Sequence, residues 1–378
     1  MRRSLIAAIA TISVAGFGLS MAYPLYSLLL GRMGASGWQI GLVNAAPAVA
    51  MLTVSPLLPA ALSRISLPTL LTLAALVSAA AFVALKAYES VWAWALLRFV
   101  LGGSATAAFF GSELWIMTAA PAARRGFFIG LYGLCLSLGF VAGPSVLWLM
   151  DIEGWGPFVA GAALSLLSIA PVIWAWRDAP TGLGGPPQPL AGTARFFRTD
   201  PSVMFAVVLF GAVEFGGFAL LPAWGEARGL TEAAAIGMIF WIALGNTVLQ
   251  LPMGWTADRV NRKGLLALAA LVCVIGPMQI LGAVEAPARM ALTLLIFGGI
   301  SVALYTVSLA ELSNRYSGEA LARGTGALMV AYGVGSLIGP SSFGLAMDLV
   351  RPDGVLYAMS AVSVVYLLLM AWRLRARA

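Results

Sequence analysis

Twelve apolar runs, most of them 20 residues or longer, recur from one end of this 378-residue chain to the other. A helix needs roughly 20 apolar residues to cross the hydrocarbon core of a bilayer, where it satisfies its own backbone hydrogen bonds. Hydrophobic residues make up 61% of the chain and charged residues only 10%, whereas soluble domains carry about 25% charged residues. We therefore predict an all-α integral membrane protein with about twelve transmembrane helices, at 4–30, 38–62, 67–86, 92–119, 126–150, 156–176, 202–224, 232–256, 264–284, 289–313, 324–350 and 354–372.

The two halves of the chain repeat one another at an offset of roughly 195 to 198 residues. Pro24 matches Pro222, and Glu113 matches Glu311. The stretch between the halves is rich in Gly and Pro, as flexible linkers are. We predict two pseudo-symmetric six-helix halves around a central site, with the N-terminal half at 1–176, a cytoplasmic linker at 177–201 and the C-terminal half at 202–378.

Basic residues predict the orientation of the spans. If the N-terminus is cytoplasmic, sixteen Lys and Arg residues fall inside and five outside, while Arg98 lies within a span. This asymmetry is what the positive-inside rule describes. We expect a multi-pass protein of the cell inner membrane with both termini in the cytoplasm. The net charge of +7 is then a signal of topology, and no nucleic-acid partner is expected.

Several motifs resemble those of the major facilitator superfamily of transporters. The loop at 254–263, Gly-Trp-Thr-Ala-Asp-Arg-Val-Asn-Arg-Lys, is similar to the superfamily motif G-x-x-x-D-R-x-G-R-K, with Asn261 in place of a glycine. The equivalent first-half loop has lost both the glycine and the aspartate. Arg98 and Gly102 resemble the fourth-helix R-x-x-x-G motif. In motif layout the chain is most similar to the YcaD-type bacterial members. The resemblance implies alternating access between two six-helix halves.

Small residues four apart let helix backbones approach closely. One such set resembles the fifth-helix motif of antiporters, which implies export, and its recurrence in the second half also favours a general packing role. The residues that we predict to pack helices in this way are Gly139, Gly143, Pro144, Gly335, Gly339 and Pro340.

Glu214 is an ionisable residue deep inside an apolar run, and its counterpart in the first half is Gly16. A carboxylate at that depth usually faces a partner or a water-filled path. The chain has no histidine, so proton handling near neutral pH falls to a carboxylate. We predict that Glu214 accepts the coupling proton; the alternative is a buried acid hydrogen-bonded to a neighbouring helix. For Arg98 we favour a structural or coupling role, either holding Glu113 or modulating the proton site, over binding of an anionic substrate.

Charged residues near the cytoplasmic ends of the spans predict a gate. By family resemblance, Asp258 and the arginines after it form a latch between the halves. Glu113 and Glu311 precede Arg-Gly pairs by the same distance, which favours a gate salt bridge in each half over proton or substrate binding. The predicted gate residues are Asp258, Arg259, Arg262, Glu113, Glu311, Arg125 and Arg323.

Polar and aromatic side chains within the spans are candidates for a substrate cavity, although most aromatic residues in such chains face lipid or pack helices. Asn246 and Gln250 lie one helical turn apart. The tentative set is Asn44, Ser112, Trp115, Asn246, Gln250, Tyr305 and Tyr332.

These features together predict a secondary transporter rather than an enzyme. No nucleotide-binding motif G-x-x-x-x-G-K-[ST] is present, so an ion gradient, which we expect to be one of protons, would supply the energy. We expect proton-coupled efflux of an amphipathic or cationic small molecule by a monomer embedded in membrane lipids, with no cofactor and no metal. The alternative is proton-symport uptake of a small anionic or neutral metabolite, and a remote one is a transport-inactive sensor or scaffold.

Overall fold

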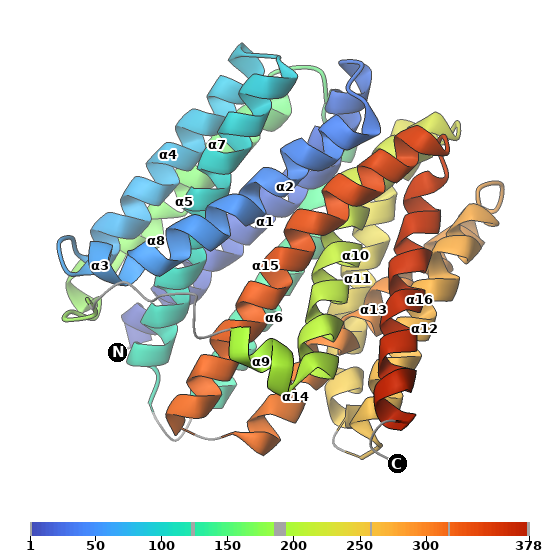
Figure 1. Ribbon diagram of the computed structural model, residues 1–378. Coiled ribbons are helices and arrows are strands. Elements are labelled where there is room, and N and C mark those ends of the chain that lie inside the picture. The colour runs from blue at the N-terminus through green and yellow to red at the C-terminus, as the bar shows by residue number, and fades with distance from the viewer. Residues whose placement is uncertain (1, 122–124, 185–193, 258, 317, 376–378) are drawn as a thin grey trace. The chain divides into compact units, whose positions relative to one another are not determined.

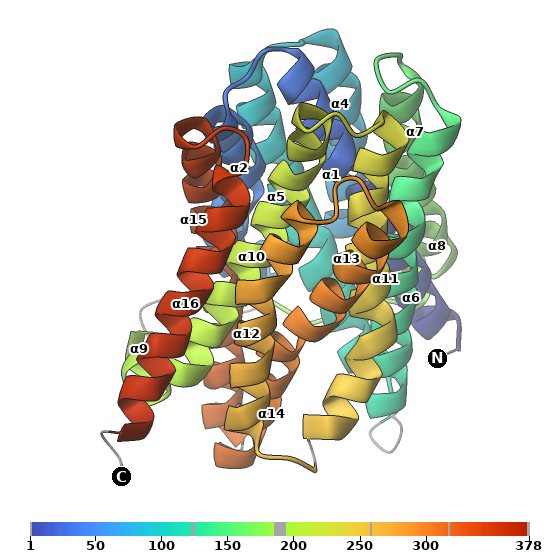
Figure 2. The same ribbon diagram turned by 90° about the vertical axis from the view of Figure 1, so that its right-hand side faces the viewer.

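The computed structural model describes residues 2–121, 125–184, 194–257, 259–316 and 318–375. Within them, twelve helical stretches are long and apolar enough to cross a membrane, and no strand occurs. Each predicted run overlaps one of these stretches, so the predicted all-α membrane fold is confirmed. Figures 1 and 2 show long helices joined by short turns.

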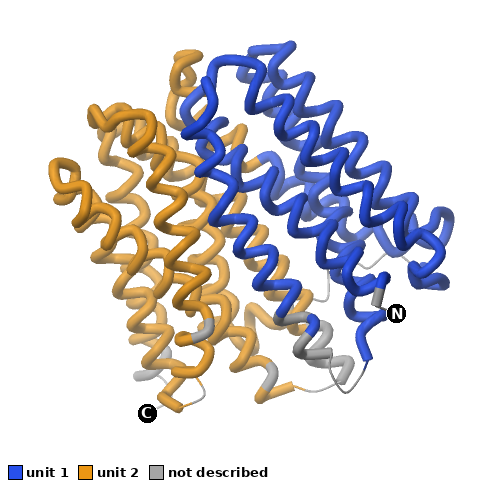
Figure 3. The backbone as a smooth tube through the Cα atoms, turned by 180° about the vertical axis from the view of Figure 1, so that it is seen from behind, with its two compact units in different colours: residues 1–29, 46–189 blue, residues 30–45, 190–378 orange. Residues whose placement is uncertain are grey.

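The chain divides into two compact units, which Figure 3 colours separately. The first comprises Met1–Leu29 and Ala46–Pro189, and the second comprises Leu30–Ala45 and Leu190–Ala378. The second unit thus takes in a short segment from the start of the chain in addition to the whole C-terminal part.

The helices of the first unit follow one another with few residues between them. In it, α4 packs against α5 and α7, and α5 packs against α6. In chain order these helices are α1 (Arg2–Arg32), α2 (Gly37–Val54), α3 (Leu58–Leu62), α4 (Leu67–Ala87), α5 (Val91–Ala119), α6 (Arg125–Val146), α7 (Gly156–Leu167) and α8 (Ile169–Trp174), with the C-terminal end of α1 and the start of α2 lying in the second unit.

Two predicted runs are interrupted by proline. The run at 38–62 becomes α2, a 3₁₀ turn at Ser55–Leu57 and α3, with Pro56 and Pro59 at the starts of the two short pieces. Within the predicted run at 156–176, α7 ends at Leu167. Pro171 has no N–H to donate to the Leu167 carbonyl four residues earlier, which agrees with the break between α7 and α8 at Ser168.

The second unit carries the other six spans. Its main helix pairs are α10 with α15, α11 with α13, and α12 with α16. Figures 1 and 2 both show α12 and α16 side by side. In chain order its helices are α9 (Ala194–Thr199), α10 (Pro201–Ala227), α11 (Glu232–Ala257), α12 (Arg262–Leu281), α13 (Pro287–Ser301), α14 (Ala303–Arg315), α15 (Gly318–Leu349) and α16 (Gly354–Arg375).

Glycines bring α10 and α15 into close backbone contact. A Cβ atom on Gly335 would meet the Val208 carbonyl oxygen, and one on Gly339 would meet the Ala212 carbonyl oxygen. Only glycine permits this approach. In the first unit Gly139 and Gly143 lie similarly against the backbone of α1. These positions agree with the packing role that we expect for the glycines.

The segment between α1 and α2 is attached to the second unit by charge. Arg32 Nη2 lies 2.5 Å from Glu226 Oε1 and 2.7 Å from Glu232 Oε2. The Asp348 carboxylate accepts hydrogen bonds from the backbone N–H groups of Gly37, at 2.6 Å, and Trp38, at 2.8 Å. Asp348 therefore caps the N-terminus of α2, where the helix dipole favours a negative charge.

Candidate transport site

Glu214 lies at the midpoint of the 27-residue helix α10. Thirteen residues separate it from either helix end, which is roughly 20 Å at the α-helical rise. Its side chain is half-buried. Glu214 therefore lies at the centre of a candidate membrane span.

Two neutral donors from neighbouring helices hold the Glu214 carboxylate. Asn246 Nδ2, on α11, donates to Glu214 Oε1 at 3.1 Å, and Tyr332 Oη, on α15, donates to Glu214 Oε2 at 2.6 Å. No ion pair to Glu214 occurs among the residues that the structure describes. The carboxyl group of Glu214 is therefore held by hydrogen bonds from neutral groups, with no cationic partner in the described ranges.

Aromatic rings pack around Tyr332, the phenol that donates to this carboxylate. Tyr332 stacks on Phe210, with ring centroids 5.8 Å apart, and meets Phe215 edge-on at 5.6 Å. Tyr305, on α14, lies 6.0 Å from Tyr332 and 6.2 Å from Phe210. The structure thus brings Glu214 together with Asn246, Tyr305 and Tyr332 from the predicted cavity set. We call Glu214, Asn246, Phe210, Phe215, Tyr305 and Tyr332 the acid–aromatic cluster.

Sequence reasoning missed Phe210 and Phe215. Both lie within one helical turn of Glu214 on α10. Their type carries no polar signal, since phenylalanines in a membrane span usually face lipid or pack helices. Helical spacing from Glu214 is the one signal that would have placed them near the carboxylate.

Arg98 lies in the first unit, on α5, and is only 2% exposed. Its guanidinium carbon is 4.4 Å from the centroid of the Tyr26 ring and 5.7 Å from that of Tyr23, both on α1. Such contacts stabilise a buried cation through the negative face of the ring. Fifteen residues of continuous helix separate Arg98 from Glu113, which is about 22 Å. Arg98 therefore does not hold Glu113 directly.

The remaining predicted cavity residues lie elsewhere. Ser112 Oγ is 3.0 Å from Tyr132 Oη, and Trp115 Nε1 donates to Ser4 Oγ at 2.7 Å, all within the first unit. The Asn44 amide donates to the Ile40 carbonyl of its own helix at 2.9 Å. Gln250 is exposed on α11. The structure does not place any of these four in the acid–aromatic cluster.

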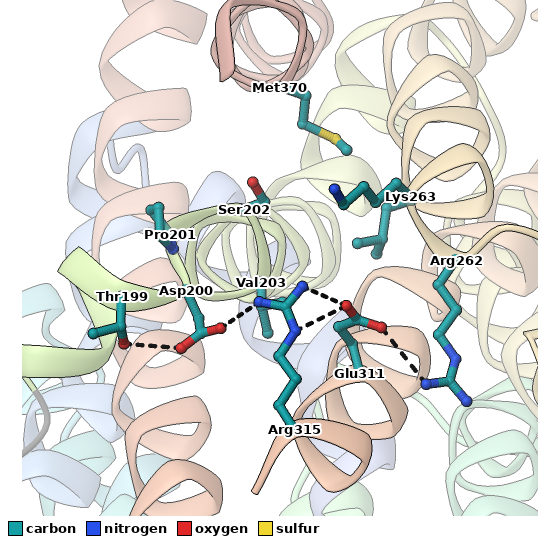
Figure 4. Close-up of a pocket in the computed structure, with 11 residues that line it drawn as sticks. Thr199, Asp200, Pro201, Ser202, Val203, Arg262, Lys263, Glu311, Arg315 and Met370 are labelled. Atoms are coloured by element: carbon teal, nitrogen blue, oxygen red, sulfur yellow. Dashed lines mark hydrogen bonds and ion pairs between the residues drawn. The ribbon is translucent and has the colours of Figure 1, made fainter. Parts of the chain in front are cut away.

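A network of ion pairs occupies the opposite end of α10 from Pro222, beside the linker (Figure 4). Asp200, directly before α10, is 4% exposed. Its carboxylate accepts hydrogen bonds from Arg315 Nη1 at 2.6 Å, Tyr316 Oη at 2.6 Å and Thr199 Oγ1 at 2.8 Å. Burial acts to raise the pKa of this carboxyl, but the three hydrogen bonds and the positive charge of Arg315 outweigh burial and hold the pKa of Asp200 below its ordinary value.

Two predicted gate residues belong to this network. Glu311 Oε1 pairs with Arg315 at 2.5 Å, and Glu311 Oε2 lies 3.6 Å from Arg262 Nη1. Arg262 also donates to the carbonyls of Ala310, at 3.1 Å, and Ala257, at 3.2 Å. The second-half acid is therefore paired with an arginine of the loop motif, which is one of the pairings that the gate hypothesis names. Sequence reasoning missed Asp200, Arg315 and Tyr316.

The other predicted gate residues do not join the network in the described structure. Arg259 lies over the ring of Trp255, 3.9 Å from its centroid. Glu113 forms no ion pair with any side chain in the described ranges. Asp258 and the side chains of Arg125 and Arg323 lie outside the described residues.

Comparison with known proteins decides the family. A sequence profile of the Major Facilitator Superfamily matches residues 8–245 and 236–378. The chain belongs to the Major Facilitator Superfamily. It is therefore a multi-pass membrane protein and a secondary transporter that works by alternating access, and its relatives are transporters rather than enzymes.

Two relatives and one solved structure illustrate the likeness. The uncharacterised MFS-type transporter YfkF of Bacillus subtilis is 22% identical over 352 residues, which cover 92% of this chain and 89% of YfkF. The uncharacterised MFS-type transporter YcaD of Escherichia coli is 25% identical over 351 residues, with the same two coverages of 92% and 89%. The expected similarity to YcaD is thus confirmed. The nucleoside transporter NupG shares the fold, with a TM-score of 0.77 at 14% identity, over 98% of this chain and 97% of NupG.

Proposed function

We propose that the chain exports amphipathic or cationic small molecules in exchange for protons, with Glu214 as the group that carries the proton. The acid–aromatic cluster supports this proposal. A carboxylate held by neutral donors attracts either a proton or a cationic substrate, and the two compete for one negative charge. Aromatic rings around it favour organic cations through their negative faces.

The coupling step follows from this competition. When Glu214 is ionised, it is available to a cationic substrate; protonation removes the charge and releases the substrate. Entry of protons from the outside then drives export of the substrate. Arg98, a buried positive charge of the first unit that lies over the Tyr26 ring, would influence the coupling between proton and substrate movement.

Transport in proteoliposomes tests the proposal. The purified protein is reconstituted, and uptake of tetraphenylphosphonium, a permanent amphipathic cation, is measured with the proton gradient imposed in either direction. We expect the cation to move against the protons, and we expect Glu214→Gln to abolish the response to the gradient. The matched control is Glu285→Gln, because Glu285 is exposed between α12 and α13.

Other results of the same transport assay would support one of the alternative functions. Movement of a small anionic or neutral solute in the same direction as protons would establish symport uptake instead. Gradient-dependent flux that persists in Glu214→Gln would remove Glu214 from the mechanism. Absence of flux for all solute classes, with an intact fold, would favour a sensor or scaffold.

We also propose that the chain lies in the bacterial inner membrane with both termini in the cytoplasm. The excess of basic residues in the loops on that side supports this orientation. Fusions of a cytoplasmic fluorescent reporter to either terminus should be fluorescent. A fusion that is active only with a periplasmic reporter would reverse the assignment.

A further inference from the structure

A pocket lies against the Asp200–Arg315–Glu311–Arg262 network, at the ends of four membrane-spanning helices (Figure 4). The spans Pro201–Ala227 and Arg262–Leu281 begin here, and the spans Pro287–Leu312 and Gly354–Trp372 end here. Its interior volume is about 30 Å³, which is room for one small polar group.

The side chains that line the pocket leave one positive charge uncompensated. Three bases line it, Arg262, Lys263 and Arg315, against two acids, Asp200 and Glu311. Both acids are engaged by arginines, Asp200 by Arg315 and Glu311 by Arg315 and Arg262. The sum of three positive and two negative charges is one positive charge, and Lys263 is the base outside these pairs. A ligand group with a single negative charge would balance the pocket.

The start of α10 adds to the attraction for an anion. Asp200 stands at the N-cap position, but its carboxylate makes no cap hydrogen bond. It is turned instead toward Arg315, Tyr316 and Thr199. Pro201 has no N–H, and the N–H groups of Val203 and Met204 bond to the Asp200 carbonyl. In the described structure Ser202, which lines the pocket, therefore has the one N–H of the first turn without a backbone partner. An uncapped helix N-terminus is favourable for a negative group.

Apolar residues on the pocket wall connect it with the lipid-facing surface. Leu266, on α12, and Met370, on α16, line the pocket beside Lys263. The same two helices expose large apolar side chains along their lengths, which suits contact with acyl chains. These are Leu268, Leu271, Ile275, Val365, Leu368 and Trp372. A ligand here would therefore place its charge among polar groups and its apolar part against α12 and α16.

We propose that this pocket binds the phosphodiester headgroup of an anionic phospholipid, with Lys263 as its main contact. One phosphodiester carries the single negative charge that the pocket lacks. Basic pockets between membrane helices on the cytoplasmic side are suited to anionic headgroups. The site is separate from the acid–aromatic cluster and does not depend on which substrate the transporter carries.

The chain has only two lysines, Lys86 and Lys263, which allows a test with an internal control. The protein is placed in nanodiscs of phosphatidylcholine, with or without phosphatidylglycerol, and treated with an amine-acylating reagent; mass spectrometry then measures labelling of each lysine. We expect phosphatidylglycerol to slow labelling of Lys263 roughly fivefold and to leave Lys86 unchanged. Lys86 belongs to the first unit and pairs with Glu89.

Further arms separate a lipid from a free anion. Equal labelling of Lys263 in both nanodiscs would overturn the proposal. Protection by inorganic phosphate in pure phosphatidylcholine, equal to that by phosphatidylglycerol, would overturn the lipid assignment and indicate a soluble phosphate ligand. By native mass spectrometry, Lys263→Gln should lose bound phosphatidylglycerol, whereas Lys263→Arg and Lys86→Gln should retain it. Retention by Lys263→Gln would also refute the assignment.

Discussion

At the scale of single residues, Glu214 differs from three other acids of the second unit. Glu226, Glu232 and Glu311 each pair with arginine, whereas Glu214 has only an amide and a phenol as hydrogen-bond donors in the described structure. A paired acid is expensive to separate from its cation. An acid with neutral donors can change its charge while its neighbours stay in place.

Tyr332→Phe tests the phenol donor. The substitution keeps the ring contacts with Phe210 and Phe215 and removes the hydrogen bond to Glu214. A hydrogen bond to a charged group contributes about 1.5–3 kcal/mol, so gradient-driven flux should fall roughly tenfold or more while the fold is retained. The matched control is Tyr357→Phe, at an exposed position on α16. Unchanged flux in Tyr332→Phe would show that the phenol does not act on the carboxylate.

Asp200 predicts how stability depends on pH. Its pKa is lower in the folded protein than in the unfolded chain, so its contribution to stability is present above the unfolded pKa, about 3.9, and is lost as pH falls through the folded pKa. Thermal unfolding should show wild type exceeding Asp200→Asn by about 2–4 °C near pH 7. The gap should be constant down to about pH 5 and should shrink below about pH 4. A gap that widens with acid would refute this sign.

Sequence reasoning found part of the site for identifiable physical reasons. Glu214 was recognisable because a carboxylate in an apolar run is costly, and Asn246 because it is a polar residue within a span. The pairing of Asp200 with Arg315 joins residues 115 positions apart, and that of Asp348 with Gly37 joins residues 311 apart. No local pattern specifies such partners, since they depend on how the helices pack.

At the scale of helices, α15 offers a comparison between two of its own glycines. A Cβ atom on Gly335 would meet the Val208 carbonyl, whereas one on Gly326 would meet nothing within 4 Å. We expect Gly335→Ala to lower the unfolding temperature by several degrees by forcing α10 and α15 apart. Gly326→Ala should be neutral or stabilising by up to about 1 kcal/mol, because alanine favours the helix. Equal effects of the two would contradict the close contact.

At this scale the number of spans could be predicted from the sequence, whereas the breaks within them could not. Apolar length alone predicted all twelve spans, because the bilayer demands it. It could not predict the division of a run into two helices at Ser168 or at Val302, since both pieces remain apolar. The predicted run begins at residue 324, six residues after the start of α15, because the charged residues Glu319 and Arg323 interrupt the apolar pattern before it.

At the scale of the whole molecule, the capping of α2 by Asp348 predicts a measurable stability. Asp348→Asn keeps the size of the side chain and removes the charge at the helix N-terminus. An anion there contributes about 0.3–1 kcal/mol, and up to about 2 kcal/mol when partly buried. We expect a fall of a few degrees in the unfolding temperature, relative to wild type and to the exposed control Glu285→Gln. No change in Asp348→Asn would show that the charge of the cap is dispensable.

Residues Leu30–Ala45 precede the linker by well over a hundred positions, yet they are packed with the helices that follow it. A ribosome that has made only the first six spans has therefore produced a piece of chain whose final neighbours do not yet exist. Those residues remain incompletely packed until α10, α11 and α15 have entered the bilayer. Folding of this transporter consequently cannot finish one half at a time, and a protein truncated at the linker would leave that early segment without its packing partners.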